Sequence, residues 1–220
     1  MKVLVLLAII LIVSPESRAD FIVSPGISVT TAHNSEETTP AGKEVVTFKS
    51  SLGMSIDSEW RFFRDSISIS AGAIWRGSEA VSQYSYTNPY NPLDTATVAD
   101  LKTNSSSLSG FIGPRFRFLN LKYFKIFAGA GLNPGILYLN FDEGKFLASN
   151  GSIIGYQEKE DQKLSGTYYE LGVELYSPKG GALRLLGRQS RQESDRFETL
   201  GNRHINLATT SAALQYMHVF

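Results

Sequence analysis

The feature that most constrains this chain is a two-residue alternation of apolar with small or polar side chains, which recurs in eight windows. This period is that of β-strands, because successive side chains of a strand point to opposite faces of a sheet. The eight windows are 21–32, 45–62, 66–78, 105–118, 123–139, 163–177, 182–190 and 205–220. No apolar run after the first twenty residues approaches the length of about 18 that suggests a membrane-spanning helix. The sequence therefore predicts an all-β protein, whose strands must close into a barrel if they cross a membrane.

The first nineteen residues have the composition of a secretory signal peptide. Lys2 precedes an unbroken apolar run over 3–13, which is followed by small residues at the −3 and −1 positions of a cleavage site. The run is too short to cross a bilayer as a helix, and the chain has no cysteine that could carry a lipid. We therefore expect residues 1–19 to be removed on export and residues 20–220 to form one domain.

The connections between the windows alternate between short and long. The short ones are 63–65, 119–122 and 178–181, and the long ones are 33–44, 79–104, 140–162 and 191–203. Short periplasmic turns and longer outer loops are typical of outer-membrane barrels, and an even strand number places both termini at the end with short turns. The predicted fold is an eight-stranded antiparallel up-and-down transmembrane β-barrel with short periplasmic turns and long extracellular loops.

Period two alone leaves two barrels open, one in a membrane and one secreted, soluble and built around an apolar cavity. The polar faces favour the membrane barrel, because they carry mostly Ser and Gly, whereas a solvated surface would carry many Lys, Glu and Asp. Such small side chains fit the interior of a narrow barrel. Aromatic residues near both ends of the apolar faces would form the two girdles of a membrane barrel. They are Phe21, Trp60, Phe62, Phe118, Phe124 and Phe220 on the periplasmic side, and Trp75 and Tyr138 on the outer side.

The end of the chain carries the most specific pattern. Leu214, Tyr216, His218 and Phe220 share one face of the last window, and the final residue is aromatic. This segment resembles the C-terminal strand that the outer-membrane assembly machinery reads in Gram-negative barrel proteins, with His218 at a position where an aromatic or aliphatic residue is commoner. In architecture, the chain after residue 19 resembles the small eight-stranded barrels of the OmpA, OmpX and OmpW class. This resemblance implies a location in the bacterial outer membrane, contact with its lipid and lipopolysaccharide, and insertion by the barrel-assembly machinery.

Charged residues on the polar faces are predicted to line the lumen. A narrow lumen cannot leave a charge unpaired, so acidic groups should be bridged by Arg or Lys from neighbouring strands. We expect the pairs Glu174–Arg184 and Glu170–Arg188. We interpret the set as an ionic plug that fixes the strand register, and the alternative is an anion-favouring conduit. The predicted lumen charges are Lys49, Asp57, Arg76, Arg115, Arg117, Lys125, Glu170, Glu174, Arg184 and Arg188.

One stripe of the lipid-facing surface is made of small residues and proline, where the other strands present large apolar side chains. A smooth stripe permits the close approach of a second copy, so a homo-oligomer is a hypothesis, although lipid also tolerates small residues. The stripe comprises Ala71, Ala73, Gly110, Pro114, Ala128, Ala130 and Pro134.

Composition and motifs argue against several classes of function. The 21 basic and 21 acidic side chains balance, so nothing favours a nucleic-acid partner, and the absence of cysteine excludes disulfide scaffolds and zinc–thiolate sites. The acidic residues of the long connections lack metal-loop spacing, and no cofactor motif is present, so we expect neither a metal nor a cofactor.

For catalysis, His204 is the histidine placed at the outer rim, but it lacks the His-x-Ser pairing of lipid A deacylase barrels, and no Gly-x-Ser-x-Gly elbow occurs. We predict a non-catalytic outer-membrane protein that acts structurally or through its surface loops. The alternative is transport of small solutes, through a narrow pore or an OmpW-like lateral route, and a lipid A-modifying enzyme is a third reading.

Overall fold

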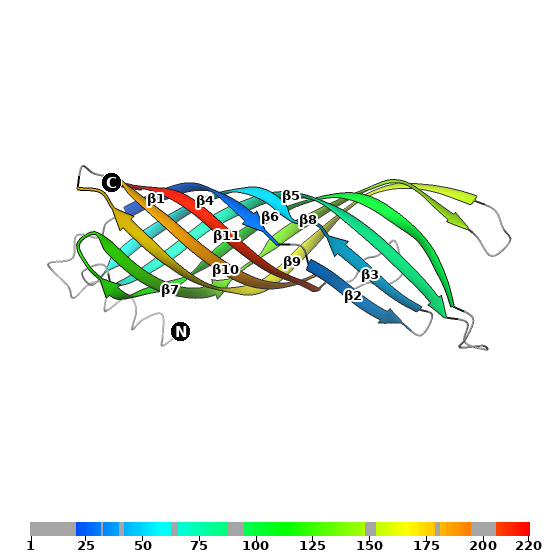
Figure 1. Ribbon diagram of the computed structural model, residues 1–220, viewed down its shortest axis with the longest axis horizontal. Helices are drawn as coiled ribbons and strands as arrows, with labels where there is room; N and C mark the ends of the chain where they lie inside the picture. The colour runs from blue at the N-terminus through cyan, green and yellow to red at the C-terminus, as the bar shows by residue number, and fades with distance from the viewer. Residues whose placement is uncertain are drawn as a thin grey trace.

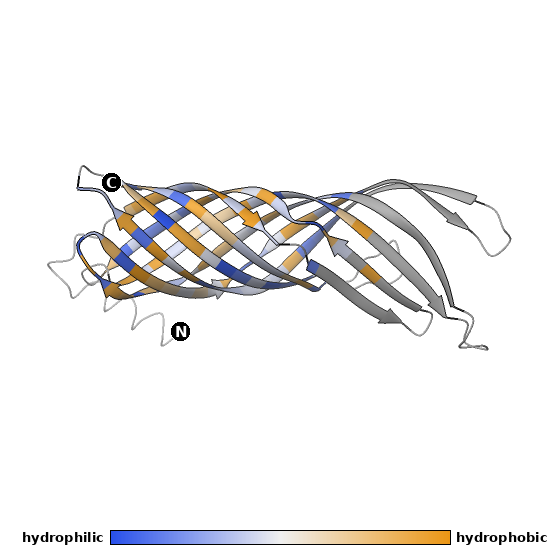
Figure 2. Ribbon diagram, viewed as in Figure 1, coloured by the Kyte–Doolittle hydropathy of each residue, from blue (hydrophilic) through white to orange (hydrophobic). Residues whose placement is uncertain are grey.

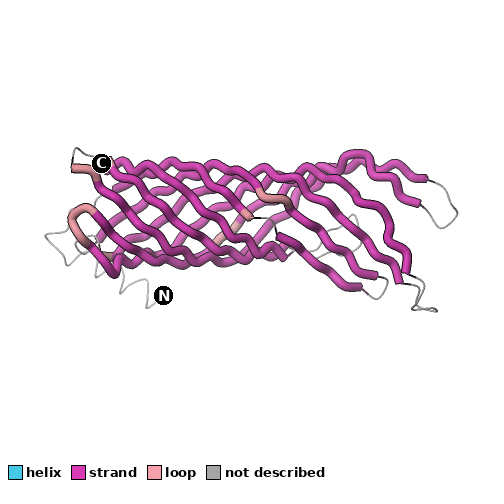
Figure 3. Tube along the Cα trace, viewed as in Figure 1, coloured by secondary structure: helices cyan, strands magenta, loops and turns pink. Residues whose placement is uncertain are grey.

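The computed structural model describes residues 21–31, 33–39, 42–62, 66–87, 95–147, 153–178, 181–194 and 206–220. Nearly all of these residues lie in β-strands, as the tube in Figure 3 shows. In these ranges no helix has the length and apolar character that crossing a membrane would require. The predicted signal peptide, residues 1–19, lies outside the described residues.

Eleven strands form eight barrel strands, because three of the barrel strands are interrupted. The strands are β1 (Phe21–Thr30), β2 (His33–Thr39), β3 (Gly42–Phe48), β4 (Ser51–Phe62), β5 (Ile67–Thr87), β6 (Thr95–Asn120), β7 (Phe124–Leu132), β8 (Gly135–Leu147), β9 (Ile153–Tyr176), β10 (Ala182–Ser194) and β11 (Asn206–Val219). β1 continues into β2, β3 into β4, and β7 into β8 (Figure 1). The interruption between β7 and β8 falls at Pro134, which has no backbone N–H to donate to a ladder.

Antiparallel pairing closes the strands into a ring. β1 pairs with β4 and β11, and the ring continues through β5, β6, the β7–β8 strand, β9 and β10 back to β11. Barrel strands that follow one another in the sequence are therefore neighbours in the sheet, and the first pairs with the last. The predicted eight-stranded up-and-down barrel is confirmed.

The two ends of the barrel differ as predicted. Both ends of the described chain lie at one end, where the Phe220 amide donates to the Phe21 carbonyl over 2.9 Å. The connections at this end are short, and the turn before β10 uses Gly181 with φ +84°, a conformation that favours glycine. At the opposite end, β5 and β6 stay paired out to Thr87 and Thr95 (Figure 1). Much of the long connections 33–44, 79–104 and 140–162 is thus hairpin, because backbone pairing continues where no lipid imposes alternation on the side chains.

The outward face of the barrel forms an exposed apolar belt. Leu52 is 74% exposed and Leu185 53% exposed, although both are large and aliphatic. Figure 2 shows hydrophobic and hydrophilic positions alternating along the barrel strands. The predicted girdle residues Trp75 and Tyr138 are also exposed. A continuous apolar belt on a closed sheet fits the hydrocarbon of a bilayer and not water, so this is a transmembrane barrel.

The inward faces carry apolar clusters in addition to the predicted polar residues. One cluster, of Ile22, Ala182 and Met217, lies at the end with the termini. A second lies on the strand segments toward the outer end, above the charged groups. Its members are Phe48, Ala80, Leu137, Leu139, Leu164 and Leu207. The charged lumen is thus bounded by apolar side chains on both sides.

Candidate functional site

Eleven charged side chains are buried inside the described barrel, four acidic and seven basic. They sit on alternate residues of β4, β5, β6, β7, β9 and β10, because the pleat sends every second side chain inward. The buried charges are Asp57, Glu59, Arg61, Arg76, Arg115, Arg117, Lys125, Glu170, Glu174, Arg184 and Arg188. Most of them form one connected network of carboxylates and guanidinium groups.

Glu59 of β4 is the most connected carboxylate of this network, and it is 0% exposed. The Arg61 Nε donates to it over 3.0 Å and the Arg115 Nη1 over 3.1 Å. The Nη2 groups of Arg117 and Arg184 donate to it as well. One buried carboxylate therefore ties together side chains from β4, β6 and β10.

Glu174 of β9 is the second hub. It accepts from the Nη2 groups of Arg184 over 2.8 Å, Arg61 over 2.9 Å and Arg117 over 2.9 Å. These three guanidinium groups also contact Glu59. The two carboxylates are thus bridged across the lumen, and the bridge links strands that lie on different sides of the ring.

Asp57 and Glu170 extend the network. Arg115 donates to Asp57 through Nη2 and to Glu170 through Nε, each over 2.5 Å. Arg184 also donates to Asp57, over 3.2 Å, and Arg188 donates to Glu170 over 2.6 Å. Every carboxylate of the network contacts at least two arginines, which compensates the cost of burying its charge.

Phe127 of β7 lies among the arginines and is 0% exposed. Its ring centroid is 5.2 Å from the Cζ of Arg115, 5.3 Å from that of Arg184 and 6.0 Å from that of Arg117, which is within cation–π range. Gly172 makes room for the ring, since a Cβ there would come within 2.6 Å of the Phe127 Cε1. The network is therefore packed around an aromatic side chain, with no column of water-exposed charge.

A second aromatic layer covers the network toward the outer end. The guanidinium of Arg188 lies 3.8 Å from the ring centroid of Phe111 and 4.9 Å from that of Tyr168. Both rings are buried. Gly72 makes room for the Phe111 ring as Gly172 does for Phe127, because a Cβ at Gly72 would lie 2.9 Å from the Phe111 Cε1.

The structure brings most of the predicted lumen charges together. Both expected pairs form, with Nη2-to-carboxylate distances of 2.8 Å for Arg184–Glu174 and 2.6 Å for Arg188–Glu170. Lys125 is buried, and its Nζ lies 4.8 Å from the ring centroid of Tyr176. Arg115, Arg117 and Asp57 lie in the same network, whereas Arg76 faces inward but lies apart from the carboxylates.

The assignment of Lys49 to the lumen network is wrong. Lys49 lies in the short break between β3 and β4, its side chain is 59% exposed, and its Nζ contacts the Glu79 carboxylate over 2.6 Å. The alternation of a continuous strand does not extend through this break. At the outer rim, the long side chain of Lys49 places its ammonium group in water beside an exposed carboxylate, and not among the buried charges.

Two central members, Glu59 and Arg61, are absent from the sequence prediction. The sequence does contain the information that places them. Glu59 and Arg61 follow Asp57 at every second position of the strand, so they point to the same side, while their neighbours Trp60 and Phe62 point to the other. The inward rings Phe111 and Phe127 also follow the parity of their strands. The predicted lumen consists of small and charged residues, so it does not include aromatic side chains on the polar faces.

The predicted assembly segment lies at the seam between the last strand and the first. Leu214, Tyr216 and Phe220 are 47%, 51% and 72% exposed on the outward side, and the His218 ring contacts the Phe220 ring at 4.5 Å. Recognition by the assembly machinery stays a prediction.

The small-residue stripe faces outward on β5, β6 and the β7–β8 strand. Pro114, Ala130 and Pro134 are exposed, and Ala71, Ala73, Gly110 and Ala128 are partly exposed. The homo-oligomer stays a prediction.

His204 lies outside the described residues. Within the described ranges, no group of three or more His, Asp or Glu side chains is arranged to hold a metal ion.

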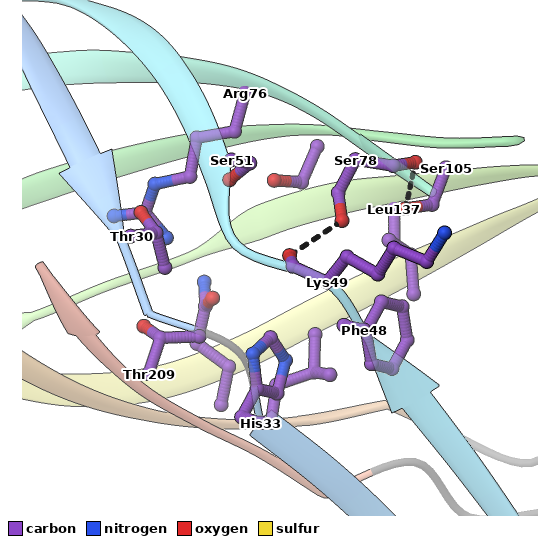
Figure 4. Close-up of a pocket in the computed structure, with 13 residues that line it drawn as sticks. Thr30, His33, Phe48, Lys49, Ser51, Arg76, Ser78, Ser105, Leu137 and Thr209 are labelled. Atoms are coloured by element: carbon purple, nitrogen blue, oxygen red, sulfur yellow. Dashed lines mark hydrogen bonds between the residues drawn. The ribbon is translucent and has the colours of Figure 1, made fainter. Parts of the chain in front are cut away.

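A small cavity lies inside the barrel beyond the network, toward the outer end (Figure 4). Its walls come from β1–β6, β8, β10, β11 and the β3–β4 break. The lining residues are Thr30, His33, Phe48, Lys49, Ser51, Arg76, Ser78, Ser105, Ser107, Leu137, Gln192, Leu207 and Thr209. His33 stacks on Phe48 with a centroid distance of 4.8 Å, and burial lowers the pKa of its imidazole, which favours the neutral ring at pH 7.

No family model matches the chain, and no curated protein gives a significant sequence match. Among solved structures, the outer membrane protein OprG from Pseudomonas aeruginosa is similar with a TM-score of 0.52 and 14% identity, over 92% of this chain and 96% of OprG. Ail, the attachment invasion locus protein of Yersinia pestis, solved with the heparin analogue sucrose octasulfate, is similar with a TM-score of 0.50 and 12% identity, over 92% of this chain and 100% of Ail. The fold is that of the small outer-membrane β-barrels. Together with the apolar belt, it identifies an outer-membrane protein, as the sequence predicted.

Proposed function

We propose that this protein is a sealed, non-catalytic outer-membrane barrel, which acts through the surface that its outer hairpins present and not through its lumen. The observation that carries the proposal is the buried network around Glu59 and Glu174. Both carboxylates are 0% exposed, as are Arg115 and Arg184. A continuous water path through the lumen would have to pass these groups and would hydrate them.

The packing on both sides of the network supports a closed lumen. Toward the termini, Ile22 is 0% and Met217 1% exposed in an apolar cluster. Toward the outer end, Phe111 is 3% and Tyr168 2% exposed. Eight strands enclose little more than the volume of their own side chains, so these layers are sufficient to fill the cross-section.

The outer hairpins support a role at the surface. The β5–β6 and β8–β9 ladders extend away from the apolar belt toward the outer end (Figure 1). A rigid barrel that carries long outer segments is a common platform for binding. Ail, which has this fold, is named as an attachment invasion locus protein, so the same architecture can support a surface role.

A second candidate is transport of small apolar solutes by a lateral route. The observation that favours it is the apolar inner layer at the outer end, which includes Phe48, Leu137 and Leu207. In addition, the last described backbone hydrogen bond between the first and last barrel strands at this end runs from the Thr31 amide to the Thr210 carbonyl, over 2.9 Å. Beyond it, the described sheet partner of β2 is β3. A solute could enter this layer from the outer end without crossing the charged network.

Solute flux across liposomes tests the proposal. Liposomes that contain the refolded protein should swell in an isosmotic arabinose solution no faster than protein-free liposomes, because the network excludes water. The double variant Glu59→Ala, Glu174→Ala should swell faster. Rapid swelling with the wild-type protein would contradict a sealed barrel.

The lateral route needs its own measurement, since it does not require flux of a polar sugar. Cells that express the protein should take up the apolar dye N-phenylnaphthylamine no faster than cells without it. Faster uptake that is lost in a Leu137→Lys variant would establish the second candidate in place of the first.

A further inference from the structure

We propose that the outer cavity binds a small oxyanion, a carboxylate, sulfate or phosphate group, with Arg76 as its main partner. This inference goes beyond the sealed barrel, because it assigns a ligand class to a cavity that the charged network does not use. It rests on the geometry of the cavity and on the state of one buried arginine.

Arg76 differs from the other described buried arginines, because no carboxylate of the described residues pairs with it. Arg61, Arg115, Arg117, Arg184 and Arg188 each contact at least one carboxylate. The guanidinium of Arg76 makes no ion pair and no hydrogen bond to any described residue, and its Nε is buried without a partner.

Burial of this cation is costly. Arg76 is 7% exposed, and the nearby Arg188 adds repulsion between like charges. An isolated buried charge is strongly unfavourable unless it is paired, so a guanidinium in this position calls for an anion.

The cavity in front of Arg76 offers hydrogen-bond donors and no negative charge. Arg76 and Thr30 both line the cavity, and Figure 4 shows them with Ser51 around the same space. The Oγ1 of Thr30 is buried and has no hydrogen-bond partner. None of the described lining residues is acidic, and the ammonium of Lys49, which also lines the cavity, is exposed and already paired with Glu79. Hydroxyl and guanidinium donors converging in a site without carboxylates match the acceptors of an oxyanion.

The dimensions and the opposite wall of the cavity restrict the ligand to a small one. The space open to the centre of a water molecule is ≈ 30 Å³. About 10–15 Å³ of such space holds one water molecule, so the cavity has room for a group larger than a single water. Phe48, Leu137 and Leu207 line the other side, where a short apolar chain attached to the anionic group would pack.

Equilibrium dialysis of radiolabelled sulfate against the intact barrel in a non-ionic detergent tests the proposal. The wild-type protein should bind one sulfate per chain in a saturable manner. Arg76→Met should weaken binding by about tenfold or more, since it removes a charge-assisted contact. Arg76→Lys should retain binding more strongly than Arg76→Met, because it keeps the charge.

Lys49→Met is the matched control, because Lys49 lines the same cavity but is exposed and already paired with Glu79. It should bind sulfate within about threefold of the wild type. Equal binding by wild type and Arg76→Met, or no saturable binding up to about 50 mM sulfate, would overturn the proposal. Circular dichroism and the heat-dependent gel shift of each variant establish that it is folded.

Competition with acetate and hexanoate distinguishes two forms of the ligand. Hexanoate that displaces sulfate better than acetate, in an Arg76-dependent manner, would support the site and place an apolar chain on Phe48 and Leu137. Equal competition by both would also support the site and restrict recognition to the anionic group. Failure of both carboxylates to compete would contradict the carboxylate part of the proposed ligand class.

Discussion

Replacing Glu59 by glutamine is expected to lower the free energy of unfolding of the barrel by about 3–5 kcal/mol. Glu59 is 0% exposed and accepts hydrogen bonds from four guanidinium groups. Glutamine keeps the shape of the side chain but removes the charge, so several buried cations lose part of their compensation at once. The penalty comes from the charges left behind, which is why removing one partner costs more than the whole network is worth.

Urea unfolding in lipid vesicles measures this loss, with the fluorescence of Trp60 and Trp75 reporting the departure of the lipid-facing strands from the bilayer. The matched control is Glu79→Gln, which breaks the pair between Lys49 and Glu79. Those side chains are 59% and 65% exposed, so we expect a loss below about 1 kcal/mol. Similar losses in the two variants would show that the lumen network does not stabilise the barrel.

Replacing Phe127 by alanine is the second substitution with a large expected effect, a loss of about 3–5 kcal/mol. The ring is 0% exposed, three arginines lie within cation–π range of it, and Gly172 leaves the space that it fills. Its removal creates a cavity among charged groups, which water would enter. The same variant is therefore expected to weaken the seal of the lumen.

Phe116→Ala is the control, because Phe116 lies on the neighbouring β6 but faces lipid and is 53% exposed. Lipid chains fill the space that this ring leaves, so its loss in unfolding free energy should be clearly smaller. The same urea titration compares the two variants. A larger loss for Phe116 would mean that the lipid-facing belt, and not the packed lumen, dominates the stability of the barrel.

The barrel itself could be predicted because lipid imposes a strict pattern. In the membrane belt each strand must alternate, as in Leu52, Met54 and Ile56 against Ser51, Ser55 and Asp57, and this alternation identified all eight barrel strands. The outer extents of β5, β6 and β9 could not be predicted in the same way. Beyond the belt the strands are held by backbone pairing, which leaves no alternation in the sequence.

The sequence predicts which type of residue lines the lumen, but not most of the contacts that these residues make. Parity placed Glu170, Glu174, Arg184 and Arg188 on the inward face, and adjacent strands gave two correct pairs. The multiple bridges through Glu59 join strands that are not neighbours, and no pattern along one strand encodes such contacts. Lys49 was misassigned because the break between β3 and β4 leaves no mark in the alternation.

The unpaired state of Arg76 was equally invisible in the sequence. Arg76 and Arg115 are both inward-facing arginines on neighbouring strands, and they differ in the charges that surround them in the folded barrel. Only the arrangement of the strands shows that the buried carboxylates gather toward the end with the termini, and that none of the described residues lining the outer cavity is acidic.

Ionic current through single refolded barrels in a planar lipid bilayer tests the sealed lumen most directly. Wild-type protein should give no steady current above that of the bare membrane, because Glu59, Glu174 and the arginines that they hold leave no hydrated path. The Glu59→Ala, Glu174→Ala variant, once inserted, should open discrete currents, in line with the faster swelling expected of it. A steady, ion-selective current from the wild type would contradict the sealed barrel and establish a pore.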